Sequence, residues 1–356
     1  MKSLYAVGLA VLSLSLSGCA RKTAPSRQSA STPQPQPIEL MDEIPLPGVQ
    51  GRIDHFTMEL NPSQLADQAR IVFSALGNNT EEVVNAFAST VAHTITGLDE
   101  PQGAVYVPDF NKLFMANAGD GTVKIYDGTS YKLLKSVSLG EDADNVRYDA
   151  AEKRVYVGYG SGASGAIAVI DAKTGQHLTG DYNAGGDHPE SFQVETKGDR
   201  IFVNVPGAGS IVSVIDRKTH AITKWHLQGA AENFPMALDE AHHRLFIGAR
   251  NPPEVVVLDT NSGEQVAAVP AAGEMDDLYY DASLKRIYSI GAVGYISVIQ
   301  QTDPDHYHLI ANVPTRIGVR TGILVSQKQY GDRLYVAIPA LPDHEAALWV
   351  YVTHGP

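Results

Sequence analysis

The chain carries seven copies of a short motif in which a basic residue opens a strand of alternating apolar residues. Their starting residues are separated by 42, 42, 46, 44, 42 and 47 residues. An internal repeat of this length, with period-2 alternation and Gly, Asp and Asn turns, is typical of a radial array of small antiparallel sheets. We therefore predict an all-β fold, a seven-bladed β-propeller with four-stranded antiparallel blades and almost no helix. The motifs begin at Arg70, Lys112, Arg154, Arg200, Arg244, Arg286 and Arg333.

Each repeat contains four predicted strands, which we name A to D from the hub to the rim. In the third repeat they are expected at 145–149, 154–158, 166–171 and 177–181. Acidic residues such as Asp149 and Asp171 stand at the first position of the A-to-B and C-to-D turns. An Asp at this position accepts hydrogen bonds from the backbone that follows it. We expect these acids to stabilise turns and to carry no chemistry.

The last repeat lacks a strand D, because the chain ends shortly after the apolar segment 348–353. The segment 38–46 precedes the first strand A and resembles the strand D of the second repeat. Pairing of 38–46 with 348–353 would close the ring and remove an open sheet edge. We therefore expect an N-terminal strand to complete the seventh blade.

The N-terminus reads as a lipoprotein signal peptide over 1–18, with an apolar run from Leu4 to Leu16 and then Ser-Gly-Cys19. Cys19 is the single cysteine of the chain and the expected site of lipidation. Residues 19–37 are rich in Pro, Ser and Gln and predict a flexible tether, and 38–356 predict the propeller. Because Ala20 follows the cysteine, we expect a lipid-anchored protein of the bacterial cell envelope, at the outer membrane and facing the periplasm.

The composition of the chain limits the classes of ligand and partner that we expect it to bind. A net charge of -13 argues against nucleic acid and anionic headgroups as ligands, since both repel an acidic surface. Contact with the membrane is therefore expected through the lipid anchor alone. With one cysteine, a metal site would have to use His, Asp, Glu or backbone oxygens. We expect a monomeric propeller that binds a small ligand or an envelope protein.

The candidate site is the mouth of the central channel, where the D-to-A and B-to-C connections emerge. Every repeat places a polar or ionisable residue at the head of its strand A. Such convergence at a concave opening is the usual pattern of a ligand site, although polar side chains could also simply face channel water. The expected funnel residues are Asp54, His55, Gln102, Asp144, Asn145, His188, Glu190, Asn233, Asp276, Asp277 and Arg320, with Asn78, Asn79, Asp120, Arg250 and His344 added by the B-to-C loops.

Several acids placed close together favour a bound cation among them. Asp144, His188, Glu190 and Asp276 are the candidate ligands of a divalent metal, the one cofactor that the sequence suggests. A second histidine pair, His306 and His308, is expected on an exposed C-to-D turn of the opposite face. No catalytic residue can be assigned.

The strand motifs Arg154-Val-Tyr-Val-Gly, Arg200-Ile-Phe-Val-Asn and Arg333-Leu-Tyr-Val-Ala are each followed by Val-Ile-Asp or a variant. They resemble the YVTN-type repeat of the bacterial YncE-like propellers, over about residues 38–353. The resemblance implies a seven-bladed propeller and, for function, a binding or surface protein. Neighbouring superfamilies include lactonases, quinoprotein dehydrogenases and haem-binding domains.

Three functions remain open at this point. The first is a membrane-tethered binding or scaffold module that uses the polar funnel. The second is a metal-dependent lactonase-like hydrolase, in which a divalent cation held by Glu190, Asp144, Asn145 or Asp276 polarises a carbonyl and a carboxylate acts as base. The third is a propeller that binds haem or another redox cofactor non-covalently, with His55 or His188 as the axial ligand.

Overall fold

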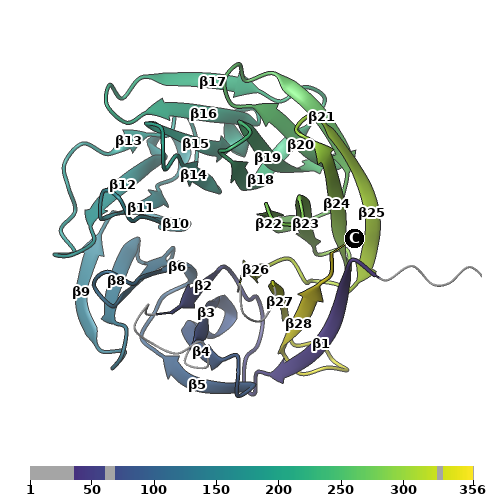
Figure 1. Cartoon of the computed structure of the whole chain (residues 1–356). Helices are drawn as coiled ribbons and strands as arrows, with labels where there is room; N and C mark the ends of the chain where they lie inside the picture. Colours follow the sequence, from purple (N-terminus) through teal and green to yellow (C-terminus); the bar gives the residue numbers. More distant parts are fainter. Residues whose placement is uncertain (1–35, 61–68, 327–331, 356) are drawn as a thin grey trace, which may run out of the picture. The chain divides into compact units, whose positions relative to one another are not determined.

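The computed structural model describes residues 36–60, 69–326 and 332–355. Within the unit that begins at Gln36, seven four-stranded antiparallel sheets form a ring (Figure 1). The predicted all-β, seven-bladed propeller is confirmed. The described residues contain no α-helix, only the short 3₁₀ turns η2 (Leu76–Asn78), η3 (Gly162–Ser164) and η4 (Pro206–Ala208). Cys19 and most of the predicted tether lie outside the described residues. Among the described residues, no helix has the length and apolar character needed to cross a membrane.

Six blades are each built from four consecutive strands, with strand A innermost and strand D at the rim. Blade 1 comprises β2 (Phe56–Glu59), β3 (Arg70–Ala75), β4 (Thr80–Asn85) and β5 (Thr90–Ile95). Blade 2 comprises β6 (Pro101–Val107), β7 (Lys112–Asn117), β8 (Thr122–Asp127) and β9 (Leu133–Ser138). Blade 3 comprises β10 (Val146–Asp149), β11 (Arg154–Tyr159), β12 (Ala166–Asp171) and β13 (Tyr182–Asn183). Blade 4 comprises β14 (Phe192–Val194), β15 (Arg200–Val205), β16 (Ile211–Asp216) and β17 (Ile222–His226). Blade 5 comprises β18 (Ala231–Asp239), β19 (Arg244–Asn251), β20 (Pro253–Asp259) and β21 (Gln265–Pro270). Blade 6 comprises β22 (Met275–Asp281), β23 (Arg286–Gly291), β24 (Tyr295–Asp303) and β25 (His306–Pro314).

The seventh blade joins the two ends of the propeller. It contains β26 (Gly322–Val325), β27 (Arg333–Ile338) and β28 (Ala347–Thr353), and its outer strand is β1 (Ile38–Pro45). β1 runs antiparallel to β28, with Ile38 opposite Thr353 and Pro45 opposite Ala347 (Figure 1). The predicted closure of the ring by the N-terminal strand is confirmed.

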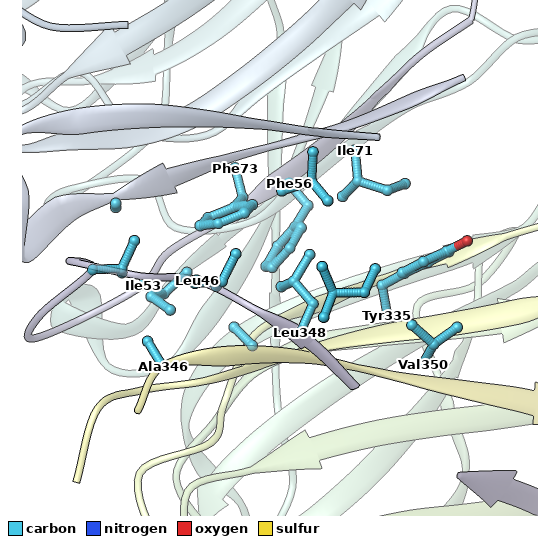
Figure 2. Packing of buried hydrophobic residues seen from close by; sticks show 14 of the residues in the cluster. Leu46, Ile53, Phe56, Ile71, Phe73, Tyr335, Ala346, Leu348 and Val350 are labelled. Carbon is cyan, nitrogen blue, oxygen red and sulfur yellow. The ribbon is translucent and has the colours of Figure 1, made fainter. Parts of the chain in front are cut away.

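Apolar side chains from facing strands fill the spaces between neighbouring blades. Figure 2 shows the cluster between the last and the first blade, where Leu348 and Val350 meet Phe56 and Phe73, whose rings lie 5.2 Å apart. Leu46, directly after β1, is buried in the same cluster. The N-terminal segment therefore contributes both backbone pairing and core packing to the closure.

The turn acids have the predicted structural role. The carboxylate of Asp149 accepts hydrogen bonds from the N–H groups of Ala151 and Glu152, and Asp171 does the same for Thr174. The expected strand D at 177–181 is wrong. His177 forms only an isolated bridge with Ile170, because its imidazole pairs with Asp181 and Gly180 adopts a φ of 92° that bends the chain away. The strand is Tyr182–Asn183 instead.

Candidate functional site

A β-bulge stands at the head of strand A and sets which side chains reach the hub. In blade 1 the N–H of Asp54 donates to the carbonyl of Ser74 at 2.7 Å, and the N–H of Ser74 donates to the carbonyl of His55 at 3.2 Å. Two residues therefore oppose one, which defines a bulge. The same pairing occurs for Asp144 and Asn145 opposite Gly158 and for Glu190 and Ser191 opposite Asn204, and register shifts lie between Pro101 and Ala104, Asn233 and Met236, and Met275 and Asp277.

The bulges explain why the funnel residues come in consecutive pairs. In a regular strand, neighbouring side chains point to opposite faces, whereas a bulge lets two neighbours point to the same side. Both members of two such pairs line a small cavity of about 20 Å³ at the mouth, which is room for about one water molecule. The lining residues are Arg52, His55, Asp144, Asn145, Glu190, Ser191, Phe234 and Asp276.

His55 lines this cavity and faces partners from two other blades. Its Nδ1 lies 3.1 Å from Oδ1 of Asp277, and its Nε2 lies 3.4 Å from Nδ2 of Asn145. Burial alone would lower the pKa of His55, but the carboxylates of Asp277 and Asp54 outweigh it and raise the pKa to about 10. We call His55, Asn145 and Asp277 the neck, since they connect three different blades across the hub.

Arginines compensate part of the acidic charge around the mouth. Asp276 pairs with Arg250 and, at 3.2 Å, with Arg320, while Arg52 lies 2.9 Å from a carboxylate oxygen of Asp54. Asp54 is fully buried, and besides Arg52 its carboxylate faces Nε2 of His55 at 3.8 Å. Burial raises the pKa of Asp54 to about 7, against the opposing influence of its cationic neighbours. Arg52 is not among the predicted residues, because it precedes the Asp54-His55 pair at the head of the strand.

Three of the four predicted metal ligands do come together. Asp144, His188 and Glu190 each offer one ligand atom, and these atoms all lie within 4.8 Å of one another. Nδ1 of His188 lies 2.7 Å from the carbonyl of Gly160, to which it donates, so Nε2 is left facing Asp144 at 3.5 Å. Metal-ligating histidines are oriented in this way, by a hydrogen bond from the other ring nitrogen. Asp276 stands apart, held by its arginine partners.

The carboxylates of this trio are poorly satisfied. Asp144 Oδ1 is buried without a hydrogen-bond partner, and the carboxylate of Glu190 makes no hydrogen bond with any described residue. Burial and the nearby Asp144 raise the pKa of Glu190 to about 7. Burial would lower the pKa of His188, yet Asp144 and Glu190 raise it to about 9. The cluster thus favours positive charge at its centre, whether a proton or a cation.

The side chains of Asn233 and Gln102 neither line the mouth cavity nor contact the charged residues around it. Asn233 is fully buried between blades, where its Nδ2 donates to Asn204 Oδ1 at 2.8 Å and to the carbonyl of Ile211 at 2.9 Å. It precedes the bulge, so Phe234 takes the position at the mouth, with the Arg250 guanidinium 3.5 Å above its ring. Gln102 contributes its backbone carbonyl to the N–H of His55 at 3.1 Å, and its side chain does not line the mouth cavity.

The B-to-C loops place fewer side chains at the funnel mouth than expected. Arg250 reaches Asp276 at the mouth, but the other loop residues are bound locally. Asn78 bonds to the backbone of Gly48 and Gln50, Asp120 pairs with Lys124, and His344 pairs with Glu43.

A larger cavity of about 360 Å³ lies farther along the strands A, and the neck residues His55, Asn145 and Asp277 form part of its lining. One layer of its lining residues stands two positions after the residues at the head of each strand A, where side chains again point to the hub. Arg147 is the charged residue of this layer, and sequence analysis missed it. The available signal was a basic residue inside the predicted strand 145–149, on the same face as Asn145. The layer comprises Thr57, Val105, Arg147, Gln193, Ala237, Tyr279 and Ile323.

Comparison with known proteins supports the predicted resemblance. No family model matches the chain. The chain is 28% identical over 170 residues to YncE of Salmonella typhi and 27% identical over 170 residues to YncE of Salmonella typhimurium strain LT2. Each match covers 47% of this chain and 46% of the relative, so it spans about half the length of these relatives. Together with the seven blades, this confirms a YncE-like propeller.

Solved structures agree on the fold. A chain of the Kuenenia stuttgartiensis hydrazine synthase superposes with a TM-score of 0.67 at 16% identity, covering 80% of this chain and 91% of its own length. A chain of a mitotic checkpoint complex superposes with a TM-score of 0.71 at 15% identity, covering 98% and 100%. Identities this low carry the architecture and no activity.

Proposed function

We propose that this YncE-like propeller is a binding module of the bacterial cell envelope. In this proposal a lipid on Cys19 and the tether 19–37 attach it to the outer membrane, and its ligand site is the funnel mouth. The signal sequence, the lone cysteine and the Pro-rich segment support the tether. The mouth site would hold a divalent metal ion through Asp144, His188 and Glu190 and present that ion to a small ligand or an envelope protein.

The observation that carries the metal is the state of His188. Its Nδ1 donates to the carbonyl of Gly160, so Nε2 faces Asp144 Oδ2 at 3.5 Å, and Oδ1 of the same buried carboxylate has no hydrogen-bond partner among the described residues. One imidazole nitrogen and two carboxylates suit Zn²⁺ or Mn²⁺ better than Ca²⁺, which prefers six or more oxygens. Three protein ligands leave at least one coordination position for a bound ligand.

A metal titration tests this function. The purified protein is stripped with a chelator and titrated with Zn²⁺ and with Mn²⁺ by calorimetry. We expect one equivalent of one of these ions to bind, and the double variant His188→Ala, Glu190→Gln to bind it about tenfold more weakly or not at all. Neither residue belongs to the packed core between blades, so the free energy of unfolding should change by only about 1 to 2 kcal/mol.

The matched control removes two histidines elsewhere. His306 and His308 lie on the rim strand β25, where His306 is bonded to Asp303. The variant His306→Ala, His308→Ala should retain the full affinity for the ion. Metal binding that survives the change at 188 and 190, or that is lost in the control, would place the ion elsewhere.

The same cluster keeps a hydrolase as the second candidate. In this alternative Asp144 and His188 would hold a cation that polarises a lactone carbonyl, and Glu190, whose pKa is raised to about 7, would act as the general base and not as a metal ligand. Hydrolysis of a small lactone by the metal-loaded protein, lost in the 188 and 190 variant, would favour this candidate. Haem has less support, because both ring nitrogens of His55 already face partners, Nδ1 the carboxylate of Asp277 and Nε2 the amide of Asn145.

A further inference from the structure

Arg147 places a positive charge inside the propeller, away from the funnel mouth. It lies on β10 and lines the channel cavity of about 360 Å³. This volume is in the range of pockets that bind small molecules. The mouth site does not use Arg147, so its role requires a separate explanation.

The hydrogen bonds of Arg147 all go to neutral groups. Its guanidinium donates to the carbonyl of Val146 at 2.8 Å, to Asn145 Oδ1 at 3.3 Å and to Ser191 Oγ at 3.2 Å. A guanidinium has five N–H groups, so two remain without an acceptor among the residues that the structure describes. No carboxylate of those residues lies within ion-pair distance. The mouth arginines Arg52, Arg250 and Arg320, in contrast, each pair with an aspartate.

Burial of this charge is not fully compensated by its surroundings. Burial lowers the pKa of Arg147, and Tyr279, Asp277 and Asp144 act on it only from a distance. The Asp277 carboxylate is already engaged by His55 at 3.1 Å and by the N–H of Gly322 at 2.9 Å. An anion in the cavity would therefore supply the charge that the protein withholds.

The walls of the cavity indicate what kind of anion fits. Thr57, Gln193 and Tyr279 add polar groups around the hub at the level of Arg147. Between them lie apolar surfaces, and the cavity extends along the strands A towards the A-to-B turns. The apolar lining includes Val105, Ala237, Leu238, Leu278 and Ile323. A ligand with one carboxylate and a compact apolar body complements both parts.

The neck lies at the boundary between this compartment and the mouth, since His55 and Asn145 line both cavities. His55 is held by Asp277 on one side and Asn145 on the other, and the mouth cavity has a volume of about 20 Å³. A molecule bound at Arg147 would therefore not share the position of the proposed metal ion. The two sites can be tested independently.

We propose that the channel of this propeller is a second site, which binds a small organic carboxylate with an apolar body. The carboxylate accepts a charge-assisted hydrogen bond from a free N–H group of Arg147, on Nε or Nη1, and the Ser191 hydroxyl holds the guanidinium in place. Binding is reversible and involves no covalent step.

Benzoate is a suitable probe, with benzamide as its uncharged analogue. Calorimetric titration of the purified protein should give saturable binding of benzoate, with benzamide at least about tenfold weaker. Arg147→Gln should weaken benzoate binding about tenfold or more. Arg147→Lys keeps the charge but loses the planar guanidinium that Asn145 and Ser191 position, so its affinity for benzoate should lie between those of the unchanged protein and the glutamine variant. Arg154→Gln, on the next strand of the same blade and with a half-exposed side chain paired with Glu152, should bind benzoate like the unchanged protein.

Several results would overturn the proposal of a carboxylate site in the channel. Absence of saturable benzoate binding below about 10 mM, equal affinity for benzamide, or full affinity in a folded Arg147→Gln variant would show that the channel holds only water. If Arg147→Gln fails to fold, the lysine variant and the benzamide comparison decide the question. Loss of benzoate binding in the His188→Ala, Glu190→Gln variant would place the anion on the mouth metal instead, whereas its retention would keep the channel site even if the metal proposal fails.

Discussion

Nδ1 of His55 lies 3.1 Å from Oδ1 of Asp277, although 222 residues separate them in the sequence. His55 directly precedes β2 in blade 1, and Asp277 is part of β22 in blade 6, so this contact passes the seventh blade and spans the hub. Asn145 of blade 3 extends the contact to the other side. The polar neck thus links blades that share no backbone pairing.

We predict that the neck stabilises the fold in a pH-dependent way. The pKa of His55 is raised to about 10 from a usual value of 6.5, so its contribution is fully present below pH 6.5 and is lost as the pH rises through about 10. His55→Gln should lower the free energy of unfolding by about 2 kcal/mol at pH 6 and by less at pH 10, measured by urea denaturation. The control His306→Gln, at an exposed ion pair, should leave stability unchanged at both pH values. A loss that is the same at pH 6 and pH 10 would contradict the charged neck.

The fold could be predicted from the sequence because a propeller repeats one local pattern. Each strand B begins with a basic residue and alternates with period 2, and the missing strand after 348–353 had one N-terminal candidate. The third-blade strand D was misplaced because a contact between His177 and Asp181 competes with extended pairing. The repeated strand motif therefore predicts the blades, whereas a side-chain contact such as that between His177 and Asp181 can shift a single strand.

The site could be predicted only in part. Polar residues at the strand heads identified the neck and the trio of Asp144, His188 and Glu190. The bulges were not recognised, so Asn233 was placed at the mouth in error and Phe234 was not chosen. Whether a side chain faces the hub depends on a one-residue shift in pairing, which the residue types alone do not reveal.

Glu81 should make the propeller more stable in mild acid than in mild base. It is fully buried in β4, where Ser74 Oγ donates to one carboxylate oxygen at 2.9 Å and the other oxygen has no partner among the described residues. Burial raises the pKa of Glu81 to about 8, above its usual value of 4.5, so its contribution to stability falls as the pH rises from about 4.5 to about 8. Glu81→Gln should therefore raise the free energy of unfolding at pH 8, by on the order of 2 kcal/mol, and change it little at pH 5. Denaturation curves at the two pH values measure this, and a variant that is less stable than the parent at pH 8 would show that the carboxylate is needed in its charged form.

Cys19→Ser should detach the protein from the membrane or block its processing. A single acyl-bearing residue provides the anchor in our proposal, and a hydroxyl in its place cannot form the thioether that carries the lipid. The measurement is fractionation of cells that express the two forms, followed by detection in soluble and outer-membrane fractions. Quantitative recovery of the serine variant with the outer membrane would rule out this anchor.

The last prediction concerns the closure of the ring. Ile44 of β1 is fully buried in the cluster between blades 7 and 1, whereas Met41 of the same strand is 54% exposed. Ile44→Ala should cost about 2 to 4 kcal/mol of unfolding free energy because it leaves a cavity, and Met41→Ala should change stability little. Deletion of residues 20–46 should lower the melting temperature by about 5 °C or more, or cause aggregation through the exposed edge of β28, while deletion of 20–36 retains β1 and should leave the melting temperature unchanged. Equal melting temperatures for the two deletions would mean that six complete blades and an open seventh are already sufficient, and that the pairing of β1 with β28 does not hold the ring together.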